Sequence, residues 1–185
     1  MTDRAFSFVG GNAGLWQVLS VEAITGASLD SVSRLQILAG IVPASHGSSW
    51  ILRGVTSNER YVTRTEKATL EAQQPQLGRA EATCAALIPI RKSASWWSLA
   101  QDERRTILEE HSHHIATGIE YLPAVARRLH HCRDLGEPFD FLTWFEYAPR
   151  DTSAFNHLAT RLRSSEEWRF VDREVDIRLE RRGAA

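Results

Sequence analysis

Cysteine is nearly absent from this chain of 185 residues, which has only Cys84 and Cys132. The two cysteines lie far apart in the sequence, so they form neither a CxxC metal pair nor a CxxCH attachment site. Two cysteines also cannot build a disulfide framework. Structural zinc ribbons and disulfide-stapled folds are therefore excluded as the basis of this protein.

Long apolar runs and an excess of charge are missing as well. No apolar stretch reaches the length of a membrane span, and the start, MTDRAFSFVGG, lacks the basic and apolar regions of a signal peptide. We therefore expect a soluble, cytoplasmic protein with no membrane partner. The net charge of −1 and the pI near 6.7 argue against nucleic acid as the main partner. Nucleotide loops, GxSxG elbows and HExxH motifs do not occur.

Most residues with distinctive chemistry lie between Glu109 and Pro149. This segment contains five of the seven histidines. A helix is expected from Gln101 to Thr117, with Gly118 as its C-cap. At about 100° per residue, His111 and His114 both border the apolar stripe of this helix. A histidine in that position is either a hydrogen-bonded core residue or a ligand, and spacing alone does not choose between the two.

The following segment has the period of a strand from Ala124 to Cys132, with His130 and His131 on opposite faces. A second strand, 139–147, follows a turn, and a hairpin symmetric about Gly136 places Arg127 opposite Phe145. A cation facing an aromatic wall needs an anion. That anion is either a carboxylate from elsewhere in the chain or a bound ligand.

The remaining segments define the expected fold. Strands are expected at residues 4–9, 15–24, 50–55, 83–90 and 171–179. The last of these strands should have one solvent-exposed face. Helices are expected at 65–73 and 153–163. Residues 25–48 are predicted to be a long connection with one short helix or strand near Ser33 to Leu38. From Thr83 onward the order is strand, helix, strand, strand, helix, strand. This order predicts an α+β protein of duplicated, ferredoxin-like split βαβ antiparallel sheets. We expect a truncated N-terminal half, residues 1–80, and a haem-binding C-terminal half, residues 81–185.

We predict haem from three features: one or two helix histidines, an unpaired strand arginine and an aromatic wall. Together they suit a flat, apolar ligand that also binds a small anion. Four segments carry a resemblance as well. They are YVTRTEK at 61–67, ATCAALIPIRKS at 82–93, the pair Trp96 and Trp97, and LPAVARRLHHCRDLGEPFDFLTWFEYAP at 122–149. Together they resemble the chlorite dismutase family, in particular its short, dimeric branch, from about Trp50 to Leu179.

The resemblance assigns roles by position. His114 matches the proximal haem ligand and Glu167 the carboxylate that orients it. Arg127 matches the distal arginine of chlorite-degrading members, and Gln74 the residue that hydrogen-bonds it. Positions that match haem or distal-side contacts are Tyr61, Lys92, Trp96, Trp97, Thr143 and Phe145.

The implied activity is that of a homodimeric haem b enzyme that converts chlorite to chloride and dioxygen. Three alternatives stay open from the sequence. The first two are a haem peroxidase and a coproheme decarboxylase of the same superfamily. The third is a dimeric binding module without haem, or with a mononuclear metal on His111, His113 and His114.

Overall fold

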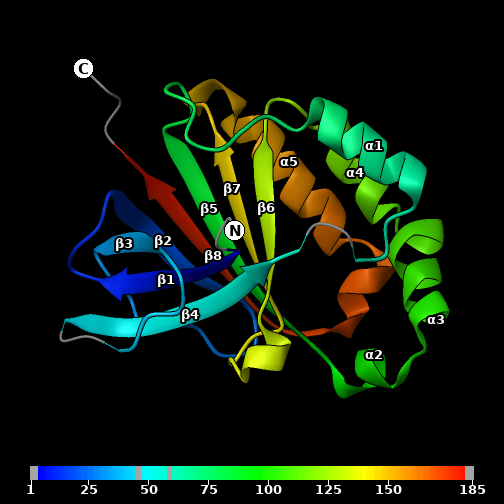
Figure 1. Cartoon of the computed structure of the whole chain (residues 1–185), viewed down its shortest axis with the longest axis horizontal. Helices are drawn as coiled ribbons and strands as arrows, with labels where there is room; N and C mark the ends of the chain where they lie inside the picture. The colour runs from blue at the N-terminus through cyan, green and yellow to red at the C-terminus, as the bar shows by residue number, and fades with distance from the viewer. Residues whose placement is uncertain (1–3, 45–46, 58–59, 182–185) are drawn as a thin grey trace.

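Eight antiparallel strands close into one barrel in the computed structural model, which describes residues 4–44, 47–57 and 60–181 (Figure 1). Around the barrel the strand order is β1-β3-β2-β8-β5-β7-β6-β4. The strands are β1 (Ala5–Gly11), β2 (Trp16–Thr25), β3 (Arg34–Ala39), β4 (Ser48–Thr56), β5 (Cys84–Lys92), β6 (Ala126–His131), β7 (Phe141–Tyr147) and β8 (Val171–Glu180). The helical elements are α1 (Arg64–Gln73), α2 (Ala94–Ser98), α3 (Gln101–Arg105), the π-helical η1 (Thr106–His111), α4 (His114–Glu120), η2 (Arg133–Leu135), η3 (Pro149–Asp151), α5 (Thr152–Arg163) and η4 (Glu166–Phe170).

The predicted pair of ferredoxin-like sheets is wrong, because the sheet is continuous and closed. Strand β2 pairs with β8 from Gln17 to Thr25, which joins the early strands to the late ones. Strand β4 closes the barrel on β6 through two residue pairs, Val55 with His131 and Thr56 with His130. Periodicity locates strands but does not say which edges pair across the chain. The division at residues 80 and 81 stays a prediction.

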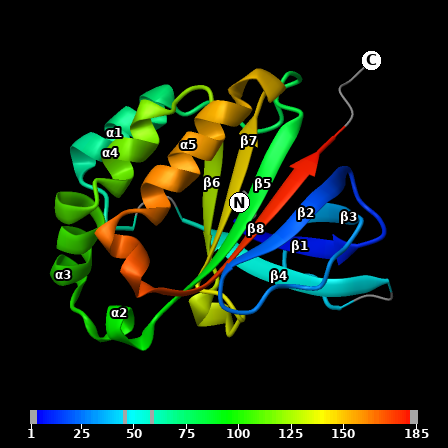
Figure 2. The ribbon, with the colours of Figure 1, turned by 180° about the vertical axis from the view of Figure 1, so that it is seen from behind.

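The two faces of the sheet are packed differently. Alternate residues of β7 enter the barrel, where Leu142 and Trp144 join the main core. Their neighbours Phe145 and Tyr147 point outward into a second cluster with Phe155 of α5. Helices α1, α4 and α5 lie over this outer face, as seen from behind in Figure 2. The space between the helices and the outer face of β5, β6 and β7 holds the candidate site.

The predicted helix from Gln101 to Thr117 is interrupted. It begins as α3, widens into the π-helical η1 and ends near Ser112. His113 takes a left-handed conformation with φ of 50°, and α4 starts anew at His114. Gly118 lies inside α4, which continues to Glu120, so its prediction as a C-cap is wrong.

Several local predictions are confirmed. The hairpin register pairs Arg127 with Phe145, and residues 34–39 form strand β3.

The solvent-exposed face predicted for β8 is wrong, because Glu174 and Asp176 are buried and paired with Arg163 of α5. No helix in the described part of the chain is long and apolar enough to cross a membrane.

Candidate functional site

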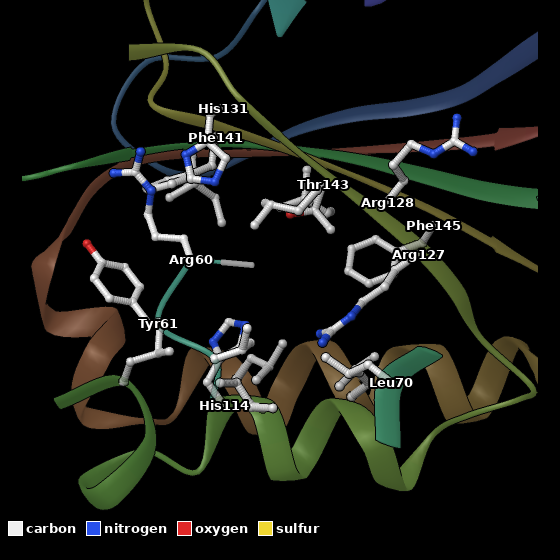
Figure 3. Close-up of a pocket in the computed structure, with 18 of the residues that line it drawn as sticks. Arg60, Tyr61, Leu70, His114, Arg127, Arg128, His131, Phe141, Thr143 and Phe145 are labelled. Atoms are coloured by element: carbon white, nitrogen blue, oxygen red, sulfur yellow. The ribbon is translucent and has the colours of Figure 1, made fainter. Parts of the chain in front are cut away.

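A cavity of about 710 Å³ lies between the outer face of the barrel and the helices (Figure 3). Its walls are largely apolar, and its apolar members include Leu70, Ile88, Ile90, Leu108, Ile115, Phe141, Phe145, Phe155, Leu158 and Leu162. His114 projects into it from the helical side, and Arg127 comes from the strand side. A large, mostly apolar space with a few polar groups is typical of a binding site for an organic ligand.

His114 is oriented by a carboxylate. Its Nδ1 lies 2.6 Å from Oε2 of Glu167, and the ring stacks on Trp168 with 6.3 Å between centroids. An ionised carboxylate can only accept a hydrogen bond, so Nδ1 carries the hydrogen and Nε2 keeps a free lone pair. Among the described residues Nε2 has no hydrogen-bond partner. This is the arrangement of a histidine ready to ligate a metal.

Glu167 is held from three sides. Lys92 donates to Oε1 over 2.6 Å, and the backbone N–H of Glu167 donates to Ser112 Oγ over 2.8 Å. Burial alone raises the pKa of this carboxyl, but its interactions with His114 and Lys92 outweigh burial and lower the pKa to about 2. Glu167 is therefore a permanent anion beneath His114.

The helix that carries His114 is held at its start by Glu109. Because the chain turns sharply at His113, Glu109 lies beneath the first turn of α4 and accepts from the backbone N–H of Ile115 at 2.6 Å and of Ala116 at 3.1 Å. The carboxylate thus satisfies two of the N–H groups that every helix leaves free. It also lies where the helix dipole favours a negative charge.

Arg127 is a cation without an anion. In the ranges that the structure describes, its guanidinium makes no hydrogen bond or ion pair. Burial lowers the pKa of Arg127, and the charge of Glu109 partly restores it. Gln74 donates to the backbone carbonyl of Arg127 rather than to the guanidinium. The side chain is therefore left free for a small anion in the cavity.

The other predicted site residues are placed as follows. Tyr61, Trp96 and Lys92 line the cavity, together with Thr143 and Phe145 from β7. The ammonium group of Lys92 donates a hydrogen bond to the Glu167 carboxylate and lies 4.6 Å from the centre of the Trp96 ring. Lys92 therefore contacts His114 only indirectly, through Glu167.

Trp97 does not line the cavity. It stacks on Phe141 and donates to Asp140, and the guanidinium groups of Arg104 and Arg133 both lie close to its ring. Its partner Trp96 is buried and lines the cavity, and Nε1 of Trp96 has no hydrogen-bond partner in the described part of the chain.

Sequence reasoning predicted Tyr61 but missed Arg60 and His131, which lie near it at a polar end of the cavity (Figure 3). Arg60 has no carboxylate partner within residues 4–44, 47–57 and 60–181, and Nε2 of His131 is buried without a partner. Burial, together with the charge of Arg60, lowers the pKa of His131 to about 4. Tyr61 is held in a left-handed conformation, φ 65°, by a hydrogen bond from Arg105 to its carbonyl. The only sequence signal for His131 was the strand face that it shares with Arg127.

The other histidines that the structure describes do not gather into a metal site. His111 faces outward and lies 3.4 Å from Glu166, while His113 is exposed. His130 lies inside the barrel, edge-on to Phe6 and Phe8. The described residues include no group of three or more metal-binding side chains. Of His111 and His114, only His114 lines the cavity.

A closed barrel with an oriented histidine and an unpaired arginine in an external cavity is typical of proteins that bind a ligand outside the barrel. Known proteins share this architecture. The family model described as chlorite dismutase matches residues 33–182. A crystal structure of a dimeric chlorite dismutase from Nitrobacter winogradskyi is 57% identical, with a TM-score of 0.89, and the match covers 95% of this chain and 99% of that one.

More distant relatives agree. A structure of chlorite dismutase from Candidatus Nitrospira defluvii in complex with imidazole shares the fold at 19% identity, with a TM-score of 0.68, over 98% of this chain and 93% of that one. A chlorite dismutase from Ideonella dechloratans is 37% identical over 76 residues, 41% of this chain. The match spans 25% of that curated relative's length. The chain belongs to the chlorite dismutase family, as the four sequence segments predicted.

Proposed function

We propose that this protein is a haem b enzyme that converts chlorite to chloride and dioxygen. The observation that carries the proposal is the pairing within one cavity of His114, with a free Nε2, and Arg127, a buried cation that lacks an anion. Family membership supports the same activity. We also propose a homodimer, because the 57% identical relative is dimeric.

The residues present fit haem. The cavity of about 710 Å³ has apolar walls for a flat macrocycle and one neutral imidazole nitrogen for iron. Its polar end, with Arg60, Tyr61 and His131, suits the carboxylates of a porphyrin. Haem, when bound, supplies an iron that accepts His114 and offers an open position to the substrate.

The residues of the chain hold the substrate and its fragments. The net reaction is ClO₂⁻ → Cl⁻ + O₂, so both oxygen atoms of one chlorite leave together and no external reductant is needed. Arg127 donates charge-assisted hydrogen bonds to the oxychlorine anion, of about 1.5 to 3 kcal/mol each. By retaining the hypochlorite-level fragment, Arg127 favours joining of the two oxygen atoms. It also protects oxidisable neighbours such as Tyr61 and Trp96.

Replacement of Arg127 tests this role. We expect Arg127→Ala to bind haem like the parent but to turn over chlorite more slowly and to bleach sooner. Oxygen evolution, followed with an electrode on haem-loaded protein, is the measurement. Arg128→Ala is the matched control, since this neighbouring guanidinium lies over the Phe6 ring instead. Durable turnover by Arg127→Ala would remove the assigned role.

The same preparation separates the alternatives. A peroxidase would oxidise dyes with peroxide faster than it evolves oxygen from chlorite, and a protein without haem would show no Soret band. A haem-loaded parent that evolves no oxygen would reject the proposed reaction while leaving the haem site in place.

A further inference from the structure

The imidazole of His131 lies at the polar end of the cavity, near Arg60 and Tyr61 (Figure 3). It makes a hydrogen bond with the backbone of Ser57, and this bond raises the pKa of the imidazole. A bond that favours the charged form is donated by the ring, so its hydrogen points to the Ser57 carbonyl. Nε2 is buried without a partner in the part of the chain that the structure describes, so Nδ1 makes the bond and Nε2 presents a bare lone pair.

The surroundings of His131 keep the ring neutral. Burial and the charge of Arg60 lower the pKa of His131 to about 4, and the opposing effects of Ser57 and Asp134 are smaller. Charged or titratable side chains that act on His131 or line the cavity from neighbouring segments are Arg4, Arg60, Tyr61, Lys67, Glu71 and Asp134, while β4 and β7 contribute Val55 and Phe141. This end of the cavity therefore offers a guanidinium that lacks a carboxylate among the described residues, beside an imidazole nitrogen that lacks a hydrogen.

A ligand carboxylate at this place meets one matching group and one mismatched group. The guanidinium of Arg60 donates to it with a charge-assisted hydrogen bond. Nε2 of His131, however, is an acceptor, and an ionised carboxylate is an acceptor as well. Two lone pairs make no hydrogen bond, so the contact needs a hydrogen that neither group carries at neutral pH. Solvent supplies this proton, which then lies between Nε2 and a carboxylate oxygen, whichever of the two holds it.

We propose that His131 binds a ligand carboxylate together with Arg60 and takes up a proton from solvent as the ligand binds. The assignment rests on the proposed function for the identity of the ligand, whose carboxylates are those of a porphyrin. Because the complex holds the extra proton, binding weakens as pH rises. Above the pKa of about 4 of free His131, each unit of pH lowers the affinity by about tenfold, until the pKa of the complex is reached.

Calorimetry tests the proposal without any substitution. When binding takes up a proton, the measured heat depends on the ionisation enthalpy of the buffer, so titrations in phosphate and in Tris at the same neutral pH count the protons. We expect the parent to take up about one proton more with haemin than with haemin dimethyl ester, in which the carboxylates are esterified. Equal proton counts for the two ligands would overturn the proposal.

The variant His131→Gln separates this residue from the rest of the cavity. A glutamine amide donates to a carboxylate directly, so we expect the variant to bind haemin with about one proton fewer than the parent, and with an affinity that varies less with pH. His157→Gln is the matched control, because His157 is exposed on α5 and should keep the parental proton count. A parental count in His131→Gln would reject the assignment.

This proposal and the proposed function fail in different ways. A parent that binds haemin with the extra proton but evolves no oxygen from chlorite would reject the proposed reaction and keep the role of His131. A parent that evolves oxygen but binds haemin without the extra proton would reject the role of His131 alone. Binding of neither haemin nor metal-free protoporphyrin IX would reject both.

Discussion

Glu167 is the residue on which the orientation of His114 depends. Glutamine at this position has one acceptor oxygen and no charge, so His114 and the buried Lys92 would compete for it. We expect Glu167→Gln to lower haem affinity by about 10- to 100-fold, the usual effect of losing a partner of a metal ligand. The rate of haem transfer to a competing haem-binding protein measures it. Glu166→Gln is the control, because Glu166 lies beside exposed His111; equal affinity in the two variants would contradict the assignment.

His130 inside the barrel makes stability depend on pH. Burial lowers the pKa of His130 to about 4. In mild acid, His130 is therefore protonated in the unfolded chain but stays neutral in the folded chain. The stability contributed by neutral His130 is full above the ordinary histidine pKa of about 6.5 and is lost as pH falls toward 4. The loss is about 3 kcal/mol.

Urea unfolding at several pH values checks this dependence. We expect His130→Leu to show a smaller loss of unfolding free energy between neutral pH and about pH 4 than the parent. The control is Gln17→Leu, at an exposed and non-titratable position of β2, which should keep the parental slope. A parental slope in His130→Leu would show that other groups cause the dependence.

Single residues also show how far the sequence could predict the site. The shared face of Arg127 and Phe145 was predictable, because hairpin pairing is local. The choice between His111 and His114 was not predictable from helical spacing, and only the family resemblance favoured His114. An uninterrupted helix puts both beside its apolar stripe, whereas the π-helical turn and the left-handed His113 rotate α4 away from that pattern.

At the scale of elements, α4 depends on Glu109. We expect Glu109→Ala to lower the free energy of unfolding by about 1 kcal/mol, since two backbone N–H groups lose their acceptor. Hydrogen exchange at Ile115 and Ala116 should accelerate more than elsewhere. Glu110→Ala, at an exposed neighbouring position, is the control. Equal exchange rates in the two variants would show that Glu109 does not hold the helix.

At the scale of the whole molecule, the barrel could not be predicted from the sequence. Strand positions follow from local alternation, but closure depends on pairing between β2 and β8 and between β4 and β6, which are distant along the chain. Every strand edge offers the same N–H and C=O groups, so pattern alone does not select the partner. The order of elements from Thr83 onward therefore suggested ferredoxin-like sheets and not a closed barrel.

The junction of β4 and β6 consists of two residue pairs, and Gly54 lets the two strands approach each other. A Cβ atom at residue 54 would lie 2.7 Å from Cβ of His130 and 3.0 Å from Sγ of Cys132. We expect Gly54→Ala to destabilise the protein by about 1 to 3 kcal/mol, the usual cost of overpacking, in urea unfolding. Ser49→Ala, exposed on the same strand, is the control. Unchanged stability would mean that the strands separate without cost.

Strand β7 divides its residues between two compartments. Leu142 and Trp144 belong to the barrel interior, and Phe141, Thr143 and Phe145 face the cavity. A protein engineer can therefore randomise the second set in a library while the first set preserves folding. Selection for new ligands and selection for solubility would then act on separate positions of one strand.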